Sequence, residues 1–311
     1  MPSPPGTPIG ARDAGAVPVV AVVGCTAAGK TGFSLDLAEA LAGEVVNTDA
    51  MQVYRGMDVG TAKLSPGERR GIPHHLLDTH DVSEPVSVAE FQGAARAVIA
   101  DLRGRDVVPV LVGGSALYTR AVLDRFEFPG TDPALRRRLE VELAEVGVAA
   151  MHQRLAEVDP EAAARILPDN ARRVVRALEV VELTGRSFTA SLPRLEYADP
   201  LTVQVGIDID RATLDERIAV RVRAMYDAGL VQEVERLGPL GPTAATAIGY
   251  RQAADHLAGE LTLDEAVEQT IAATRRFARR QESWWRRDPR IRWVPHDDPA
   301  IVDRAVAAVT G

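Results

Sequence analysis

Cysteine, aromatic residues and long apolar runs are all scarce in this sequence. Its 311 residues include one cysteine, so an intramolecular disulfide is impossible and we expect a reducing, cytoplasmic compartment. No window approaches the about 18 consecutive apolar residues of a membrane-spanning helix, so we expect no membrane association. Only 5% of the residues are aromatic, and the net charge is −8. A chain this acidic is not a general nucleic-acid binder, and a nucleic-acid site would require a local basic patch.

The remaining composition is that of a soluble globular protein. With 46% hydrophobic and 26% charged residues, the chain is long enough for a sizeable core in one large or two ordinary domains. Residues 1–16 are rich in proline, glycine, alanine and serine, and they lack the basic start and apolar core of a signal peptide. We expect a disordered tail there.

The most informative local pattern is at residues 24–31, which match the phosphate-binding loop G-x-x-x-x-G-K-[ST] at every fixed position. Residues 19–23, just before it, form an unbroken apolar run, as expected of a buried parallel strand. Residues 33–42, just after it, carry apolar side chains at helical spacing. A strand, a glycine-containing loop and a helix in this order favour a phosphate site over a chance match.

Each residue type in this loop suits an anion. Glycine allows the tight turn that exposes backbone N–H groups, and the following helix adds the positive end of its dipole. Lys30 can reach terminal phosphate oxygens, and the Thr31 hydroxyl can hold Mg²⁺. Cys25 occupies a variable position, which favours an unreactive thiol over a functional one. The loop alone identifies neither the phosphate compound nor whether a phosphoryl group is transferred.

Two further side chains are expected at the ligand edge of the same sheet. Asp49 follows the apolar stretch at residues 45–46, and Ser115 follows the predicted strand at residues 107–112. Asp49 is a candidate general base, magnesium ligand or helix cap. Ser115 is either a binding hydroxyl or the cap of a helix over residues 116–124.

Three neighbouring features carry weaker indications. Residues 50–63 are polar and punctuated by glycine, which is typical of a loop that contacts substrate. His74 and His75 suggest a metal site, but adjacent strand residues point to opposite faces and no third ligand has a suitable spacing. Pro109 is unfavourable in the middle of a sheet, so we expect irregular pairing there.

From about residue 132 to residue 191 the sequence predicts helices and no strand. Asp132 is a helix cap, and proline occupies the first helical position after it. An all-helical block inside an α/β chain indicates an inserted domain. Its arginines are interspersed with acids, which favours ordinary solvated charges. The predicted helices cover residues 133–146, 148–157, 160–166 and 171–183.

Beyond this block, residues 201–209 predict a strand that returns the chain to the sheet, and a helix follows. Arg217 and Arg221 are four residues apart on that helix, so they share a face. Two guanidinium groups on one face suit a diphosphate, because each offers a forked pair of donors. The alternative is exposed pairing with Asp215 or Glu216.

The long helix predicted for residues 262–285 ends in a basic stretch that holds every tryptophan of the chain. Such a patch is what RNA phosphates and unstacked bases require. The alternative is a C-terminal helix whose tryptophans pack in the core. The arginines of this stretch are Arg275, Arg276, Arg279, Arg280, Arg286, Arg287, Arg290 and Arg292.

Several motifs together resemble the tRNA dimethylallyltransferase family. The block at residues 47–63 is the most specific of them, whereas the phosphate loop alone occurs in many families. The resemblance extends from about residue 19 to residue 293. Its other segments are residues 24–31, 74–78, 113–118, 176–180, 248–252 and 279–281.

The resemblance implies an α/β fold, with a P-loop parallel sheet, flanking helices and an inserted all-helical tRNA-binding domain. The catalytic core then comprises residues 17–125 and 199–311, and the insertion comprises residues 126–198. It also implies a monomeric, magnesium-assisted cytoplasmic enzyme. Such an enzyme moves a dimethylallyl group from dimethylallyl diphosphate to the exocyclic amine of the adenosine 3′-adjacent to the anticodon, in tRNAs that read UNN codons.

Roles for individual residues follow from the same resemblance. Asp49 accepts a proton from the attacking amine, Thr31 and Arg221 complete the catalytic set, and Thr31 holds Mg²⁺. The phosphate-binding residues are Gly24, Cys25, Thr26, Ala27, Ala28, Gly29, Lys30, Thr31, Arg217 and Arg221. The tRNA-binding residues are Asp49, Ala50, Met51, Gln52, Ser115, Arg136, Arg172, Arg176, Gly249, Tyr250, Arg251, Arg279, Arg280 and Gln281.

The chain departs from the family's commoner pattern at two positions. Ala50 stands where serine is expected, and Ser115 replaces a threonine but keeps its hydroxyl. Three other functions remain as alternatives: a small-molecule or nucleoside kinase that binds ATP in the same loop, a prenyltransferase acting on free adenine nucleotides, and an RNA-binding protein without catalysis. The helical insertion counts against the first two, and the intact Lys30, Thr31 and Asp49 count against the third.

Overall fold

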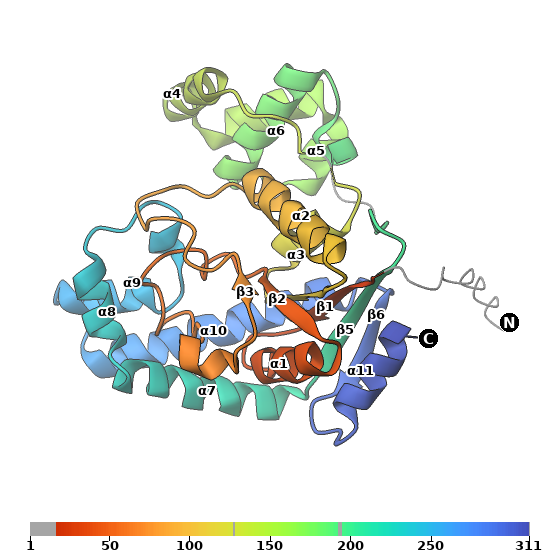
Figure 1. Cartoon of the computed structure of the whole chain (residues 1–311). Coiled ribbons are helices and arrows are strands. Elements are labelled where there is room, and N and C mark those ends of the chain that lie inside the picture. The colour runs from red at the N-terminus through yellow and green to blue at the C-terminus, as the bar shows by residue number, and fades with distance from the viewer. Residues whose placement is uncertain (1–16, 127, 192–194, 311) are drawn as a thin grey trace, which may run out of the picture. The chain divides into compact units, whose positions relative to one another are not determined.

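A six-stranded, fully parallel sheet organises the larger part of the molecule (Figure 1). This computed structural model describes residues 17–126, 128–191 and 195–310, so the tail expected at residues 1–16 lies outside the described residues. The strand order is β3-β2-β4-β1-β5-β6. The strands are β1 Val19–Val23, β2 Gly43–Asn47, β3 His74–His75, β4 Val108–Val112, β5 Thr202–Asp208 and β6 Ile291–Pro295.

Helices cover both faces of the sheet, with α1 on one side and α2 on the other (Figure 1). Capping agrees with the sequence at several helix starts: Ser87 accepts a hydrogen bond from Glu90 N, and Thr262 accepts one from Glu265 N. The helices of this part are α1 Lys30–Ala40, α2 Val88–Gly104, α3 Ala116–Leu123, α7 Arg211–Asp227, α8 Leu230–Leu237, α9 Tyr250–Leu257, α10 Leu263–Trp285 and α11 Ile301–Thr310. No helix in the described ranges is long and apolar enough to cross a membrane.

The main core is built from β-branched strand residues and apolar helix faces. All five residues of β1 are buried, as its apolar sequence predicts for a strand with neighbours on both sides. Val20 and Val205 from the sheet pack with Leu37 of α1 and Ile218 of α7. This packing fixes the carboxyl ends of the central strands, where the functional loops begin.

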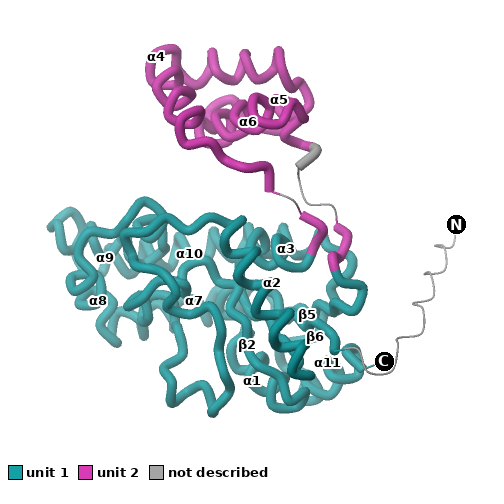
Figure 2. Tube along the Cα trace, turned by 45° about the horizontal axis from the view of Figure 1, so that its top comes forward, with its two compact units in different colours: residues 1–123, 199–311 teal, residues 124–198 magenta. Residues whose placement is uncertain are grey.

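Two compact units make up the chain, and the second is helical (Figure 2). The first comprises the described parts of residues 1–123 and 199–311, and the second comprises Asp124–Ala198, whereas the sequence placed the insertion at residues 126–198. The ends of the second unit lie side by side, because Asp124 bridges Tyr197 and Arg125 N donates to Glu196 O at 2.9 Å. Its elements are α4 Pro133–Val158, α5 Pro160–Arg165, the short 3₁₀ turn Phe188–Ser191 and α6 Ala171–Thr184.

The helical unit has its own core and follows the predicted capping. Asp132 accepts hydrogen bonds from Ala134 N and Leu135 N, and Pro133 opens α4. Gly147, with φ 80° and ψ 164°, interrupts α4 at the point where the sequence predicted one helix to end and another to begin. Leu139 and Leu178, from α4 and α6, are fully buried in this core.

One strand was missed, and another contains the proline that was expected to disturb its pairing. β6 was not predicted, because residues 291–295 alternate apolar and exposed side chains within a stretch that was interpreted as a basic patch. Pro109 lies in β4, which is a central strand. It is opposite Glu44 on the β2 side, while the ladder to β1 begins only at Val110. The expected irregularity is therefore confined to the first two residues of β4.

Candidate active site

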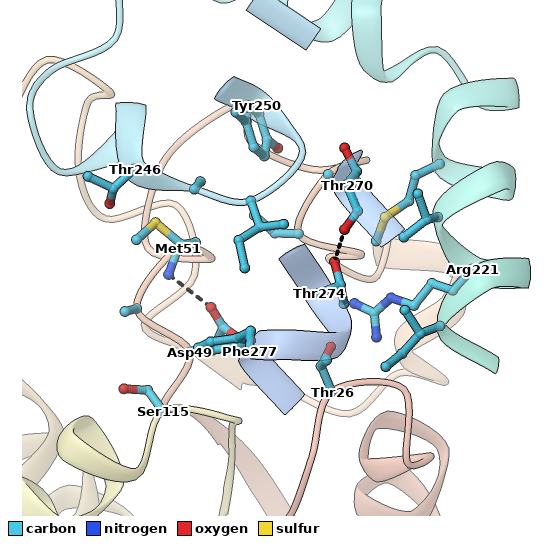
Figure 3. Close-up of a pocket in the computed structure, with 18 of the residues that line it drawn as sticks. Thr26, Asp49, Met51, Ser115, Arg221, Thr246, Tyr250, Thr270, Thr274 and Phe277 are labelled. Atoms are coloured by element: carbon cyan, nitrogen blue, oxygen red, sulfur yellow. Dashed lines mark hydrogen bonds between the residues drawn. The ribbon is translucent and has the colours of Figure 1, made fainter. Parts of the chain in front are cut away.

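Three loops that follow neighbouring strands converge at one edge of the sheet. The loop at residues 24–29 follows β1, Asp49 follows β2, and Ser115 follows β4. Since the sheet order is β2-β4-β1, these three carboxyl ends are adjacent. Figure 3 shows Thr26, Asp49 and Ser115 around a common space. The sequence-based placement at the ligand edge is confirmed for all three.

A cavity of about 360 Å³ opens at this edge, and its wall is mostly apolar (Figure 3). Asp49 and Arg221 lie on opposite sides of this cavity, and Arg280 is a third charged residue in its lining. A smaller cavity of about 90 Å³ shares Thr26, Asp49 and Arg221 and adds Lys30 and Thr31. The apolar and aromatic lining of the larger cavity consists of Met51, Ile218, Val222, Met225, Ala247, Ile248, Tyr250 and Phe277. The shared residues therefore join an apolar chamber to the phosphate loop.

Asp49 is held in a turn with one carboxylate oxygen left over. Its Oδ1 accepts a hydrogen bond from Met51 N at 2.9 Å, and its own N–H donates to Asn47 Oδ1 at 2.8 Å. No hydrogen bond to Oδ2 is formed within the described part of the chain. The helix-cap interpretation is wrong, because no helix begins here and the segment continues as turns to residue 65. The free oxygen is available to accept a proton from a ligand.

Lys30 is a half-buried cation close to a second one, Arg221. Its Nζ donates to Cys25 O at 2.7 Å. Burial, and then the charge of Arg221, lower the pKa of Lys30 to about 8, while Asp49 acts in the opposite direction. Burial also lowers the pKa of Arg221, and Asp49 opposes this shift. Two desolvated cations with one carboxylate make a place where an anion is stabilised.

Arg217 borders the same place from the solvent side. Lys30, Thr31, Arg217 and Arg221 together line an open hollow beside the loop. The pairing of Arg217 with Asp215 or Glu216 is not found among the described residues, where Asp215 instead lies 3.6 Å from Arg211 and 4.0 Å from Arg275. The prediction that Arg217 and Arg221 share one face of the helix is therefore confirmed, because both line the hollow.

Gln281 hydrogen-bonds two distant backbone groups, which the sequence did not reveal. It is buried on α10, its Oε1 accepts from Thr26 N at 2.9 Å, and its Nε2 donates to Gly114 O at 2.8 Å. The residue predicted to contact tRNA thus ties the phosphate loop to the segment that carries Ser115. Cys25 behaves similarly, because its buried thiol donates to Ala278 O and burial raises its pKa.

The other predicted RNA contacts of the larger unit divide into exposed and buried side chains. Arg251, Arg279 and Arg280 are exposed, and Arg280 also lines the cavity. Tyr250 is buried but presents its ring to the cavity, as Figure 3 shows. Gly249 N donates to Gln252 Oε1 at 2.9 Å. Ala50, Met51 and Ser115 line the cavity, and Gln52 lines the smaller one.

The tryptophans of the C-terminal stretch differ in burial. Trp285 is buried in the core, whereas Trp284 is 48% exposed. Trp293 lies under the guanidinium of Arg286 at 4.2 Å from the ring centroid. Only part of the stretch is therefore an exposed basic and aromatic patch.

In the helical unit, Arg136 and Arg176 both pair with Glu179, which is fully buried. Arg176 also donates to Pro129 O at 2.7 Å. Burial raises the pKa of Glu179, but the two arginines outweigh it and the pKa is lowered. Both arginines thus have a structural role, while Arg172 is exposed. The sequence did not indicate this, because nothing local marks Glu179 as buried.

Replacing Glu179 by glutamine is expected to lower the free energy of unfolding by about 1–3 kcal/mol, because two arginines lose their charged acceptor. The measurement is urea-induced unfolding of the full chain followed by circular dichroism. Glu161→Gln is the control, since Glu161 forms an exposed i, i+4 pair with Arg165 that contributes below about 1 kcal/mol. Equal effects of the two substitutions would contradict the structural role.

Each of the two adjacent histidines has one ring nitrogen in contact with the fold. His74 Nδ1 lies 2.8 Å from Ile72 O, and His75 Nε2 lies 2.6 Å from Glu44 Oε2. Within the described ranges, no group of three His, Cys, Asp or Glu side chains could hold a metal ion.

Phe277 and Glu233 were not singled out from the sequence. Phe277 lines both cavities, and it lies four residues before Gln281 on the same face of α10, a spacing that could have pointed to it. Glu233 is buried on α8 and hydrogen-bonds a loop more than 170 positions earlier in the chain, which no local signal indicates.

Comparison with known proteins agrees with this architecture. A family model described as IPP transferase matches residues 52–288. A curated tRNA dimethylallyltransferase from a Nocardioides species is 69% identical, with 94% of this chain and 96% of the relative covered. Another from Thermobifida fusca is 57% identical over 94% of each chain.

Solved structures are similar over most of the chain as well. The tRNA isopentenylpyrophosphate transferase of Bacillus halodurans has a TM-score of 0.68 at 39% identity, covering 93% of this chain and 95% of that one. A eukaryotic dimethylallyltransferase acting on tRNA has a TM-score of 0.80 at 26% identity, covering 93% and 76%. With the family model matching most of the chain and relatives this similar along nearly its whole length, the chain belongs to the IPP transferase family.

Proposed function

We propose that this protein transfers a dimethylallyl group from dimethylallyl diphosphate to the exocyclic amine of an adenosine in tRNA and releases diphosphate. The acceptor is the adenosine 3′-adjacent to the anticodon in tRNAs that read UNN codons. The observation that carries the proposal is the position of Asp49 and Arg221, between an apolar chamber and a cationic phosphate loop. The relatives named as tRNA dimethylallyltransferases support it.

The geometry suggests how the reaction proceeds. The diphosphate lies against Lys30, Arg217 and Arg221, which neutralise the charge that builds on it as the carbon–oxygen bond breaks. The amine nitrogen forms a bond to the allylic carbon, and its proton passes to Asp49 Oδ2. The adenine must leave its stack to enter the chamber, whose apolar wall and Phe277 suit a base and a short prenyl chain.

Magnesium fits this site through oxygen ligands. Thr31 lines the smaller cavity with Asp49, and no described cluster of acidic side chains could bind the ion alone, so most ligands would be substrate oxygens and water. We propose that the Thr31 hydroxyl holds Mg²⁺ together with the diphosphate. When bound, Mg²⁺ would offset the negative charge of the diphosphate leaving group.

The RNA surface of the proposal consists of exposed cations. Each unit, taken by itself, offers exposed arginines to RNA phosphates: Arg172 on the helical unit, and Arg251, Arg279 and Arg280 on the larger unit. A monomer is the proposed working form, since the larger unit by itself supplies the apolar wall, Asp49 and Arg221 of the chamber. The single cysteine supports a cytoplasmic location.

The test is transfer of labelled dimethylallyl diphosphate to an unmodified anticodon stem-loop, with ATP and free AMP as competitors. Label in the RNA that neither competitor suppresses is expected. Turnover of ATP without label in RNA would favour the kinase alternative, and labelled AMP would favour prenylation of free nucleotides. RNA binding without any transfer would leave the non-catalytic alternative.

The affinity for dimethylallyl diphosphate is expected to fall as the pH rises through about 8. Lys30 is charged below that pKa and neutral above it, so the loss begins there and approaches tenfold per pH unit. A diphosphate ester, with a last pKa of about 6, is already ionised in this window. Calorimetric titration between pH 7 and 9.5 without RNA measures the effect. Lys30→Met should bind weakly with a flat profile, and a pH dependence retained in that variant would refute the assignment to Lys30.

A further inference from the structure

Glu233 is a buried carboxylate that collects four hydrogen bonds. Its Oε2 accepts from Asp58 N at 3.1 Å and from Val59 N at 2.7 Å. Its Oε1 accepts from Gly60 N at 3.2 Å and from Tyr250 Oη at 2.5 Å. The side chain is 3% exposed and forms no ion pair within the described residues. Three consecutive backbone N–H groups and a hydroxyl therefore compensate its charge.

The four donors belong to two different walls of the chamber. Gly60 and Thr61, from the loop at residues 51–63, line one wall, and Ile248 and Tyr250 line the other. Burial and the adjacent Glu233 raise the pKa of Tyr250, so the phenol stays neutral and donates. Glu233 stands behind both walls and hydrogen-bonds each of them.

The two walls also meet in tight contact beside this carboxylate. A Cβ atom on Gly60 would overlap the ring of Tyr250 and come within 2.8 Å of Leu230 Cδ1, so only glycine allows this approach. The rest of the loop is held by its own groups and by residues 78–84: Lys63 Nζ donates to Tyr54 O at 2.8 Å and to Asp78 Oδ1 at 2.6 Å, and His80 N donates to Val53 O at 2.9 Å. The Glu233 contacts add polar links from this loop to the helices α8 and α9.

We propose that Glu233 is a positioning residue that holds the two walls of the chamber at the separation required by the acceptor base. The proposal rests on the proposed transferase function of the same chamber. Glu233 is bonded by the hydroxyl of Tyr250 and is not among the residues that line the chamber, so it touches no reacting atom. Its hydrogen-bond partners do not include Lys30, Arg217 or Arg221, the side chains assigned to diphosphate binding. Its removal is therefore expected to act on acceptor placement and not on diphosphate binding.

Glu233→Gln tests this directly, because an amide NH₂ then faces N–H donors at one of the two oxygen positions. We expect kcat for prenyl transfer to fall about 100-fold, the loss typical of an ångström-scale misplacement, with KM for dimethylallyl diphosphate nearly unchanged. Glu233→Asp keeps the carboxylate and should recover part of kcat. Glu235→Gln, two residues along α8 and exposed, is the matched control and should behave as wild type.

Hydrogen exchange separates positioning from unfolding. In the Glu233 variants, the amides of residues 58–60 should exchange faster while those of β1 stay protected. If Glu233→Gln loses protection throughout, Glu233→Asp becomes the deciding variant. Wild-type kcat in a folded Glu233 variant, or a change confined to KM for dimethylallyl diphosphate, would overturn the inference. A wild-type protein that transfers no prenyl group would instead refute the proposed function.

Discussion

Asp49→Asn is expected to reduce the rate of prenyl transfer by about 10²–10⁴-fold, the usual contribution of a positioned general base. Asparagine keeps the size of the side chain and can still accept the hydrogen bond from Met51 N through its amide oxygen. It cannot accept a proton from the attacking amine. Single-turnover transfer to an anticodon stem-loop, with saturating substrates, measures the loss.

For the same substitution we expect the affinity for dimethylallyl diphosphate not to fall, in contrast to the rate. Asp49 raises the pKa of Lys30, but as a carboxylate it also repels a diphosphate that approaches Lys30 and Arg221. Dimethylallyl diphosphate should therefore bind Asp49→Asn as tightly as wild type, or more tightly. Asp101→Asn, on the exposed face of α2, is the control and should leave both quantities unchanged. A rate within a few-fold of wild type would remove Asp49 from the role of base.

Arg221→Ala is expected to lower kcat by about 10²–10³-fold, equivalent to about 2.7–4 kcal/mol of transition-state stabilisation. Arg221 is half-buried and lines both the phosphate hollow and the chamber, so its interaction with developing charge is less screened than at the open surface. Arg221→Lys should restore only part of the rate, because an ammonium group cannot offer the forked donor pair. Steady-state kinetics with varied dimethylallyl diphosphate measures kcat and KM separately.

Arg223→Ala provides the matched control for this experiment. Arg223 lies two residues further along α7, is exposed, and pairs with Glu268 at 3.0 Å on the surface. It should show wild-type kinetics. If Arg221→Ala raised KM and left kcat unchanged, the guanidinium would bind substrate and transition state equally, and its assigned role in leaving-group stabilisation would be wrong.

Features that depend on nearby residues were predictable from the sequence. The phosphate loop, its strand and its helix lie within about two dozen residues, and the i, i+4 spacing of Arg217 and Arg221 fixes their common face. The convergence of Asp49 and Ser115 followed from the rule that parallel strands present their carboxyl ends at one edge. Each of these required only periodicity and topology.

Features that depend on distant partners were not predictable. Gln281 was assigned to RNA binding, because its partner in the phosphate loop is 255 positions away. Glu233 was overlooked, because its partners are up to 175 positions away. Arg136 resembled a solvated or RNA-binding charge until Glu179, 43 positions further on, was found buried beside it. Side-chain type tells what a residue can bond to, but only the packed fold tells which partner it meets.

The adjacent ends of the helical unit also bear on how such a protein can be altered. Asp124 and Tyr197 pair with each other, so the chain leaves and re-enters the larger unit at neighbouring points. A segment inserted between such neighbouring points adds a closure cost that grows only slowly with its length. The strands on either side, β4 and β5, keep their register in the sheet through β1 and not through the insert. The helical unit can therefore be exchanged or shortened as a cassette while the sheet edge is left intact.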